Sequence, residues 1–553
     1  MTVTAHYGEQ IGPAPTSDAA VRPSTSGSEE MPAHPMQRRI AYAAVSVLCG
    51  ITAGLGNALV SANLPQIQGH LGLTPVEGQW LPAAYLMTNI SANLLLLKFR
   101  QQYGLRRFAQ IGMPAYAAVT LLHLLVESFA MALFVRAVSG FATSVLSSFA
   151  TLYMLQAFGK RLNTRGVVIG IGVSQLATPI AWLLSPPLLD LGEWRTLYIF
   201  EGGLALCCLS AVSLLHLPLG QRIRVYEWHD LVTFVLLAPA LALLVAVLAQ
   251  GRIQWWTTQP WMASALVGAL LLGIAGLAFE GCREHPLIQL RWIGTADTIR
   301  LVIGAIAIRF LLSEQTFGAV GLLRQLGMGP DQLQPLYACM LLGLVVGIGL
   351  SALTIGPKTM IPQILLSIVL IAIAAFLDHD STSLTRPHDM FLSQTLLSVG
   401  AGMFLGPLLL TTISSALEQG PAFIVSATVL FSVSQNMGGL LGPAALGTFQ
   451  YIRQHDYSSS INANVDPTDP VVANRLRLAS GAYAKVLTDP VLRQAEGVAS
   501  VAQSATQQAN VRAFNDVFLL TGQLAIVDLA WSFAYVVRGR RRAKRAMSIP
   551  AKT

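Results

Sequence analysis

Charge is scarce in this chain of 553 residues, because only 11% are Asp, Glu, Lys or Arg, against about 25% in an ordinary soluble domain. No G-x-x-x-x-G-K-[ST] phosphate-binding loop is present, since the segments 159–160 and 356–358 both lack the pattern. The five cysteines form no C-x-x-C pair and have no histidines at metal-ligand spacing, and no haem, zinc or dinucleotide motif occurs. These absences predict a protein that is not an enzyme and that needs no metal or cofactor.

Apolar residues take the place of the missing charge. They make up 53% of the chain, and the mean hydropathy is +0.57. A membrane-spanning helix needs about 20 mostly apolar residues, and about fourteen runs of that kind alternate with short polar loops. We therefore expect an all-α polytopic membrane protein. The runs cover residues 40–60, 80–97, 108–126, 130–155, 166–184, 197–217, 231–248, 261–279, 301–322, 336–353, 361–377, 391–413, 423–449 and 517–537.

The basic residues fix the expected orientation, because cytoplasmic loops carry an excess of Lys and Arg. They cluster before the first run and after every second one, at Arg38, Arg39, Lys98, Arg100, Arg106, Arg107, Lys160, Arg161, Arg165, Arg222, Arg224, Arg283, Arg291 and Lys358, and in RGRRRAKR at 538–545. The intervening loops carry acids: Glu77, Asp190, Glu193, Asp378, Asp380 and Asp389. Both termini are therefore predicted to be cytoplasmic, in a bacterial inner membrane. The excess of Lys and Arg over Asp and Glu follows from this topology. No nucleic-acid partner is expected.

Three polar segments lie outside the apolar runs. Residues 1–37 are predicted to be a disordered cytoplasmic tail, and 541–553 a basic cytoplasmic tail. The segment 451–513 is predicted to be a periplasmic helical hairpin, since Asp469-Pro470 and Asp489-Pro490 are helix-start signals. Its two heptad seams are expected to pack together. They comprise Val472, Leu476, Ala479, Tyr483 and Val486, and then Val491, Ala495, Val498, Ala502, Ala505 and Ala509.

A series of motifs follows the spans in order. They are GLGNALVSANLP at 54–65, QWLPAAYLM at 79–87, KFRQQYGLRR at 98–107, RAVSGFATS at 136–144, EWRTLYIF at 193–200 and SVSQNMGGLLGPAALGTF at 432–449. In this order the chain resembles the major facilitator superfamily, and specifically its fourteen-span drug:proton antiporter branch, the EmrB/QacA-like multidrug efflux permeases. The cytoplasmic loop motif is matched through Gly104, Arg106 and Arg107.

The resemblance implies a major facilitator fold with six, two and six spans. We expect a six-helix bundle at 38–220, a two-helix linker at 221–296 and a second six-helix bundle at 297–540. It further implies that substrate binds at the midplane between the bundles and that a proton gradient supplies the energy. Arg136 is then expected to couple proton movement to substrate transport.

The chain departs from the family pattern at positions linked to coupling. Gly56 stands where the family has an acidic residue in the first span, and Gln101 replaces the family Asp of the cytoplasmic loop. The antiporter signature reads SQLATPIAWL at 174–183, which keeps Pro179 but lacks the glycines.

Ionisable residues inside the spans are the sharpest local clues, because each is costly in hydrocarbon unless it is paired or hydrated. Glu314 and Arg309 share one predicted helix, but five positions turn about 140°, so they cannot pair on one face. Asp528 lies deep in the last run, and Glu201 one turn inside the sixth. Proton or substrate handling is one interpretation, and a structural interhelical pair is the other. Glu201 could replace the acid missing from the first span, with interfacial snorkelling as the alternative.

Amides add a predicted polar lining, because in lipid they seek polar partners on other helices. Contact with substrate and contact with one another stay open as alternatives. The candidates are Asn57, Asn89, Asn93, Gln175, Gln315, Gln435 and Asn436.

The function predicted from the sequence is secondary active transport, as proton-driven efflux of amphipathic or hydrophobic drugs or toxic compounds. The alternative is an uptake symporter or a carrier of another small molecule, and a third hypothesis is a receptor or scaffold that has lost transport. Partners are the small-molecule substrate and the lipid bilayer. Through 451–513, a periplasmic membrane-fusion adaptor and an outer-membrane channel are further expected partners, unless the hairpin only covers the mouth of the transporter.

Overall fold

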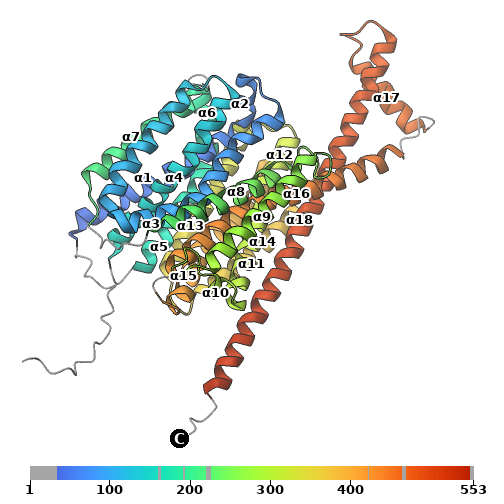
Figure 1. The fold of residues 1–553 in the computed structure, drawn as a ribbon. Coiled ribbons are helices and arrows are strands. Elements are labelled where there is room, and N and C mark those ends of the chain that lie inside the picture. The colour runs from blue at the N-terminus through green and yellow to red at the C-terminus, as the bar shows by residue number, and fades with distance from the viewer. Residues whose placement is uncertain are drawn as a thin grey trace, which may run out of the picture.

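The computed structural model describes residues 34–547 except 160–162, 191–193, 219–225, 421–422 and 464–468. Most of the predicted tail 1–37 lies outside the described residues, as do the predicted loop residues Lys160, Arg161, Glu193, Arg222 and Arg224. Every regular element in the described ranges is a helix (Figure 1), so the predicted all-α class is confirmed.

The first half of the chain forms one group of helices with its own buried core. Its elements are α1 (Met36–Ala62), α2 (Leu64–Leu71), α3 (Pro75–Leu122), η1 (His123–Leu125), α4 (Phe129–Phe158), α5 (Asn163–Gly172), η3 (Val173–Leu176), α6 (Ala177–Asp190) and α7 (Arg195–Leu214). Two long apolar helices follow, α8 (Trp228–Gln250) and α9 (Pro260–Gly281).

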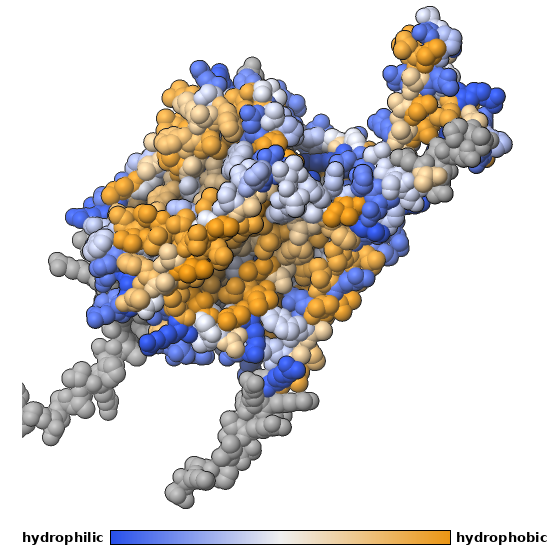
Figure 2. Space-filling model, turned by 45° about the vertical axis from the view of Figure 1, so that its right-hand side comes forward, coloured by the Kyte–Doolittle hydropathy of each residue, from blue (hydrophilic) through white to orange (hydrophobic). Residues whose placement is uncertain are grey.

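The second half forms a second group around separate cores. It contains α10 (Leu290–Ile293), α11 (Ala296–Leu311), η4 (Glu314–Ala319), α12 (Val320–Gln325), α13 (Pro330–Thr354), α14 (Met360–Asp378), η5 (Pro387–Met390), α15 (Phe391–Leu417), α16 (Phe423–Ala463), α17 (Pro470–Ala482) and α18 (Pro490–Met547). Figure 2 shows hydrophobic residues over the flank of this helical body, as expected of a surface that faces lipid.

Each predicted apolar run lies mostly within these helices, and twelve helices of the described chain are long and apolar enough to span a membrane. The helix α3 holds two of the predicted runs. The run 301–322 is divided among α11, η4 and α12, each shorter than a span. The count of fourteen spans stays a prediction. The connection predicted at 98–107 is present as a break at Gly104, whose φ is 80°, where the two helical segments of α3 meet without a longer loop.

The linker helices α8 and α9 are tied to the first half by buried charges. Lys98 of α3 pairs with Asp230 of α8 at 2.8 Å, and Arg283 pairs with Asp230 at 2.8 Å and with Glu280 of α9 at 2.6 Å. Asp230 and Glu280 are fully buried. Charges removed from water need such partners, so this network fixes the linker against α3.

The segment between α16 and the last span differs in part from the prediction. The helix α16 runs on to Ala463, and α18 is continuous from Pro490 through the last span into the predicted basic tail 541–553. The predicted helix starts are confirmed, because the carboxylates of Asp469 and Asp489 each accept an N–H two residues on at 2.8 Å. The resulting hairpin projects from the body, at the opposite end from the C-terminal end of α18 (Figure 1).

The predicted register of that hairpin is wrong in its second helix. Val491 is 73% exposed and Val498 49% exposed, so neither forms a packed seam. The contact is made instead by Gly497, which lies directly against Ser480 of α17. A glycine allows the two backbones to approach closely, and this approach sets the register in place of the heptad pattern.

Candidate functional site

Arg136 of α4 is the centre of a polar cluster inside the first half, and only 1% of it is exposed. Its guanidinium donates to the carbonyl oxygen of Gly56 at 2.8 Å and to Asn57 Oδ1 at 2.7 Å, both on α1. It also lies over the ring of Tyr85 at 4.7 Å and donates to the Leu81 carbonyl at 3.4 Å. Three helices thus hold one buried cation in a fixed position.

Glu201 of α7 supplies the carboxylate of this cluster. A Cβ atom on Gly56 would lie 2.7 Å from Glu201 Oε1, so the glutamate occupies the space that a side chain at position 56 would fill. Glu201 is 3% exposed, and its Oε2 has no hydrogen-bond partner among the described residues. Arg136 acts on it electrostatically. The geometry thus brings Glu201 next to position 56, and its replacement of the missing acid stays a prediction.

Aromatic and histidine side chains enclose the cluster on one side. The rings of His123 and Tyr198 stack with centroids 4.6 Å apart, and a cavity of about 10 Å³ lies among His123, Arg136 and their neighbours. A space of about 10–15 Å³ holds one water molecule. Nε2 of His123 and Nε1 of Trp194, two residues that line this cavity, are buried without hydrogen-bond partners in the described chain. The arrangement leaves room for one water beside polar groups that lack partners.

A second cluster lies in the other half of the molecule, around Glu314 in η4. The side-chain amide of Gln394 on α15 donates to Glu314 Oε1 at 3.2 Å and to Asp378 Oδ2 at 2.7 Å. Glu314 and Gln394 are fully buried and Asp378 is 3% exposed. Two carboxyl groups therefore share one amide, and no cation within ion-pair distance is described for either.

Asp378 and Gln394 are the functional candidates that sequence reasoning missed. Asp378 was predicted to lie in a periplasmic loop, which is wrong, because it is the last residue of α14 and points into the protein. The sequence does contain one signal for Asp378. It directly follows the apolar run 361–377, so its side chain can still reach a buried position at the end of that helix. Glu314 itself lies in a π-helical turn, a local widening that often occurs at functional sites.

Two other predicted coupling residues stand apart from these clusters. Asp528 on α18 is 7% exposed, and its Oδ2 has no hydrogen-bond partner within the described ranges. Arg309 on α11 is half-buried and packs against the glycine backbone of α16 at Gly438 and Gly439. The structure gives Arg309 and Glu314 no mutual contact, as their spacing predicts.

Asn57, Asn89 and Asn436 each bond within their own half of the molecule. Asn57 accepts from Arg136, as described above. Asn89 donates to the Gly140 carbonyl at 3.0 Å, and Asn436 donates to the Ser432 carbonyl in its own helix at 2.9 Å. Asn57 and Asn89 thus join helices of the first half, while Asn436 bonds within α16.

Two of the other amides cross the boundary between the halves, and Gln315 bonds within the second half. Asn93 donates to Ser432 Oγ at 3.1 Å and Gln175 to the Ala401 carbonyl at 3.5 Å, so each joins the two halves. Gln315 bonds Ser398 at 2.8 Å. Gln435 has both amide atoms buried without partners in the described chain.

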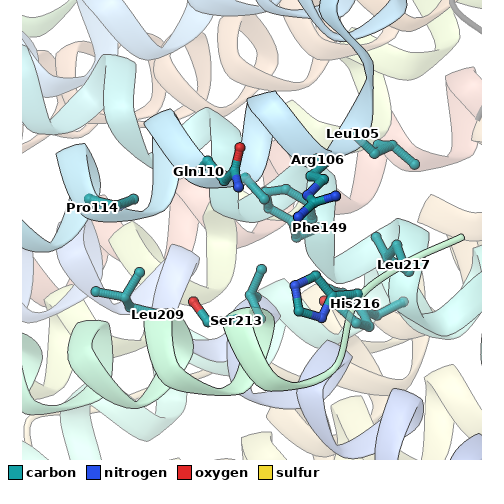
Figure 3. A pocket seen from close by; sticks show the side chains of 12 residues that line it. Leu105, Arg106, Gln110, Pro114, Phe149, Leu209, Ser213, His216 and Leu217 are labelled. Atoms are coloured by element: carbon teal, nitrogen blue, oxygen red, sulfur yellow. The ribbon is translucent and has the colours of Figure 1, made fainter. Parts of the chain in front are cut away.

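The loop motif lies at the end of the molecule where α1 begins. Gly104 is buried at the break in α3, while Arg106 and Arg107 are exposed. Arg106 borders a cavity of about 590 Å³ between α3, α4 and α7, shown in Figure 3. This cavity lies within the first half. At the boundary between the halves, the rings of Trp182 and Tyr337 approach to 4.6 Å. A substrate site at the midplane stays a prediction.

Comparison with known proteins decides the family. Residues 46–443 match the family model described as Major Facilitator Superfamily. The chain belongs to the major facilitator superfamily. It is therefore a multi-pass membrane transporter and not an enzyme, as the sequence predicted.

Several curated proteins are similar over most of their length. A triacylglyceride transporter of Mycolicibacterium smegmatis is 27% identical over 80% of this chain and 79% of its own. A puromycin resistance protein of Streptomyces alboniger is 24% identical over 75% and 83%. The multidrug export protein EmrB of Haemophilus influenzae is 20% identical over 86% and 92%. The resemblance seen in the motifs is thereby confirmed at the level of the superfamily.

Solved transporter structures share the fold. The human organic anion transporter MFSD10 gives a TM-score of 0.52 at 16% identity, covering 89% of this chain and all of that one. The tetrameric PepTSo2 structure in space group P4212 gives 0.55 at 14% identity, over 91% and 99%. At such identities the likeness establishes the fold alone.

Proposed function

We propose that this transporter exports amphipathic or hydrophobic compounds from a bacterial cell in exchange for protons across the inner membrane. The observation that carries the proposal is the position of Glu201. Its carboxylate occupies the space at Gly56 where a side chain on the first span would lie, and Arg136 donates to the carbonyl of that same residue. The acid that the drug:proton antiporter branch carries on that span is thus replaced from α7, and the proton-binding chemistry is retained.

The burial of the carboxylates supports proton coupling. A carboxyl group without a counter-charge is costly inside a membrane protein unless it binds a proton or meets water. Glu201, Glu314 and Asp528 each have an oxygen that is buried without a partner in the described ranges. A group that loses and regains a proton as the two halves alternate their access supplies the coupling that secondary transport needs.

Reconstituted vesicles test this proposal directly. An imposed proton gradient should drive accumulation of a labelled lipophilic drug, and a protonophore should stop it. Glu201→Gln keeps the size and hydrogen bonds of the side chain but cannot titrate, so gradient-driven transport should fall at least tenfold while drug binding persists. The matched control is Glu127→Gln, because Glu127 is exposed in the turn before α4. Transport in Glu201→Gln that responds to the gradient like wild type would refute the assignment.

A lipid cargo is the second candidate function. It is favoured by the similarity to the triacylglyceride transporter, which extends over 80% of this chain. The same vesicles, loaded with labelled triacylglyceride, distinguish the two cargoes. Movement of lipid without movement of drug would assign the chain to lipid transport, and accumulation of a polar nutrient with the proton flux would favour the uptake alternative.

We further propose that the hairpin binds a periplasmic adaptor protein that continues the export path to an outer-membrane channel. Several apolar side chains of the hairpin are exposed. Val471, Val486 and Val491 are each more than 70% exposed. The base of the hairpin is held firmly, because Arg453 of α16 donates to Asp516 of α18 at 2.6 Å. A rigid projection with exposed valines at its end suits a helical partner better than a lid, which would lie over the body.

A truncation tests the adaptor proposal. Replacing 468–506 by a short Gly/Ser linker should leave transport in vesicles intact and abolish both adaptor co-purification and cellular drug resistance. The milder variant changes Val471, Val486 and Val491 to Ser, and the control makes the same change at Val47, an exposed residue on α1. If vesicle transport is lost together with resistance, the hairpin belongs to the transport cycle and the adaptor proposal is wrong.

A further inference from the structure

The cavity of about 590 Å³ in the first half is a groove between two lipid-facing helices. At one end α3 and α7 touch, since a Cβ on Gly202 would lie 2.9 Å from Leu121. Toward the other end they diverge, and the buried rings of Phe149 and Tyr153 on α4 form the floor. Exposed apolar residues flank the groove on both helices, namely Ile111 of α3 and Leu206 and Leu214 of α7. The groove therefore opens toward the hydrocarbon of the bilayer.

The wide end of the groove is polar and basic. Arg106 of α3 points into it and faces His216, which follows the end of α7 (Figure 3). Neither the Arg106 guanidinium nor the His216 ring makes a hydrogen bond to another described residue, and no carboxylate lines the groove. The break at Gly104 begins a second helical segment here, whose N-terminal end carries partial positive charge.

The backbone around His216 is held so that its ring stays in this position. Tyr153 Oη donates to the Leu215 carbonyl at 2.5 Å, and Tyr42 Oη donates to the His216 carbonyl at 3.3 Å. These two bonds satisfy carbonyl groups left free at the end of α7. The basic end of the groove is thus a built feature of the fold.

We propose that this groove binds an anionic phospholipid of the cytoplasmic leaflet, with the phosphate at Arg106 and His216 and an acyl chain along the apolar wall. The chemistry matches at both ends, because an anionic head group needs cations and the chain needs an apolar channel open to lipid. Basic pockets between spans at the cytoplasmic side are suited to anionic head groups. The cavity volume also lies within the roughly 300–1,000 Å³ typical of ligand sites.

Lipid retention by the purified protein tests the proposal independently of any transport activity. The full chain is reconstituted in nanodiscs of phosphatidylglycerol and phosphatidylcholine, extracted in mild detergent, and its retained lipid is measured by native mass spectrometry. Wild type should retain phosphatidylglycerol in preference to phosphatidylcholine. Arg106→Gln should reduce that preference about fivefold, the effect of roughly one basic contact. Ser213→Trp, which fills the groove from an exposed position, should reduce retention of both lipids.

The charge-matched control is Arg291→Gln, since Arg291 is exposed on α10 and lies outside the groove. It should retain phosphatidylglycerol like wild type. Equal retention of the two lipids by wild type, or equal losses in Arg106→Gln and Arg291→Gln, would overturn the proposal. Displacement of the retained lipid by the exported drug at stoichiometric concentration would also overturn it, because the groove would then be a cargo site. Failure of drug transport would leave these measurements unchanged.

Discussion

Moving the carboxylate of the Arg136 cluster from α7 back to α1 is the most direct perturbation of the proposed mechanism. A side chain at position 56 would begin 2.7 Å from Glu201 Oε1, so Gly56→Asp alone forces two carboxylates into one space. At about 4 Å and an effective dielectric constant near 20, like charges repel by about 4 kcal/mol. We expect Gly56→Asp alone to destabilise the protein and to abolish transport.

In the double variant Gly56→Asp/Glu201→Ala, the effects of the two substitutions should not be additive. Glu201→Ala alone removes the titrating group and should stop gradient-driven transport without unfolding the protein. Adding the aspartate on α1 then places one carboxylate beside Arg136 again. Because residues in direct contact couple by about 0.5–3 kcal/mol, we expect the double variant to regain melting temperature relative to Gly56→Asp and to regain gradient-driven transport.

The assay is a double-mutant cycle measured in two ways, by thermal unfolding in detergent and by proton-driven drug accumulation in vesicles. The control is Gly56→Asn/Glu201→Ala, which has the same volume and no charge, and it should regain stability without regaining coupling. Additive losses in the double variant would show that Glu201 does not occupy the functional place of the first-span acid. Recovery of coupling by the asparagine control would show that a titrating carboxylate is not needed.

Three further predictions concern other parts of the chain. Glu314→Gln should abolish gradient-driven export yet keep measurable substrate binding, since the amide cannot titrate; wild-type coupling in vesicles would move the role to another carboxyl group. Asp230→Asn should lower stability by about 3 kcal/mol, because it leaves the buried cation Lys98 without its ion-pair partner while Arg283 keeps Glu280; a melting temperature like that of wild type would contradict this. Asp489→Ala removes a helix cap worth about 1 kcal/mol, so amide hydrogen exchange should accelerate in the first turn of α18 while the transmembrane part stays protected.

The helical membrane fold could be predicted because its signals are local. A run of about 20 apolar residues has few alternatives to a spanning helix, and the caps at Asp469 and Asp489 depend only on neighbouring residues. The break in α3 could not be predicted in this way. Gly104 belongs to the loop motif, but nothing in the neighbouring residues decides whether two helices are joined there by a loop or by a break at one residue.

Side chains that act together from distant parts of the sequence were harder to predict. Asp378 and Glu314 come within reach of one amide only because α14, α15 and η4 pack together. On the sequence, Asp378 reads as the first residue of a polar loop. The hairpin register failed for a related reason, because the close approach at Gly497 outweighs a seam of small apolar residues that would bury little area.

The role proposed for Glu201 depends both on a local sequence pattern and on the packing of distant helices. The sequence identified a missing acid at position 56 and a spare one on the sixth span, but only the fold places the second in the space left by the first. The proposed coupling depends on a carboxylate near Arg136, whichever helix carries it. A backbone carbonyl of α1 contacts the guanidinium at Gly56, so Arg136 is anchored to α1 without an acidic side chain there. Transporters that lack the first-span acid should therefore be searched for a carboxylate on the facing turn of the sixth span before proton coupling is ruled out.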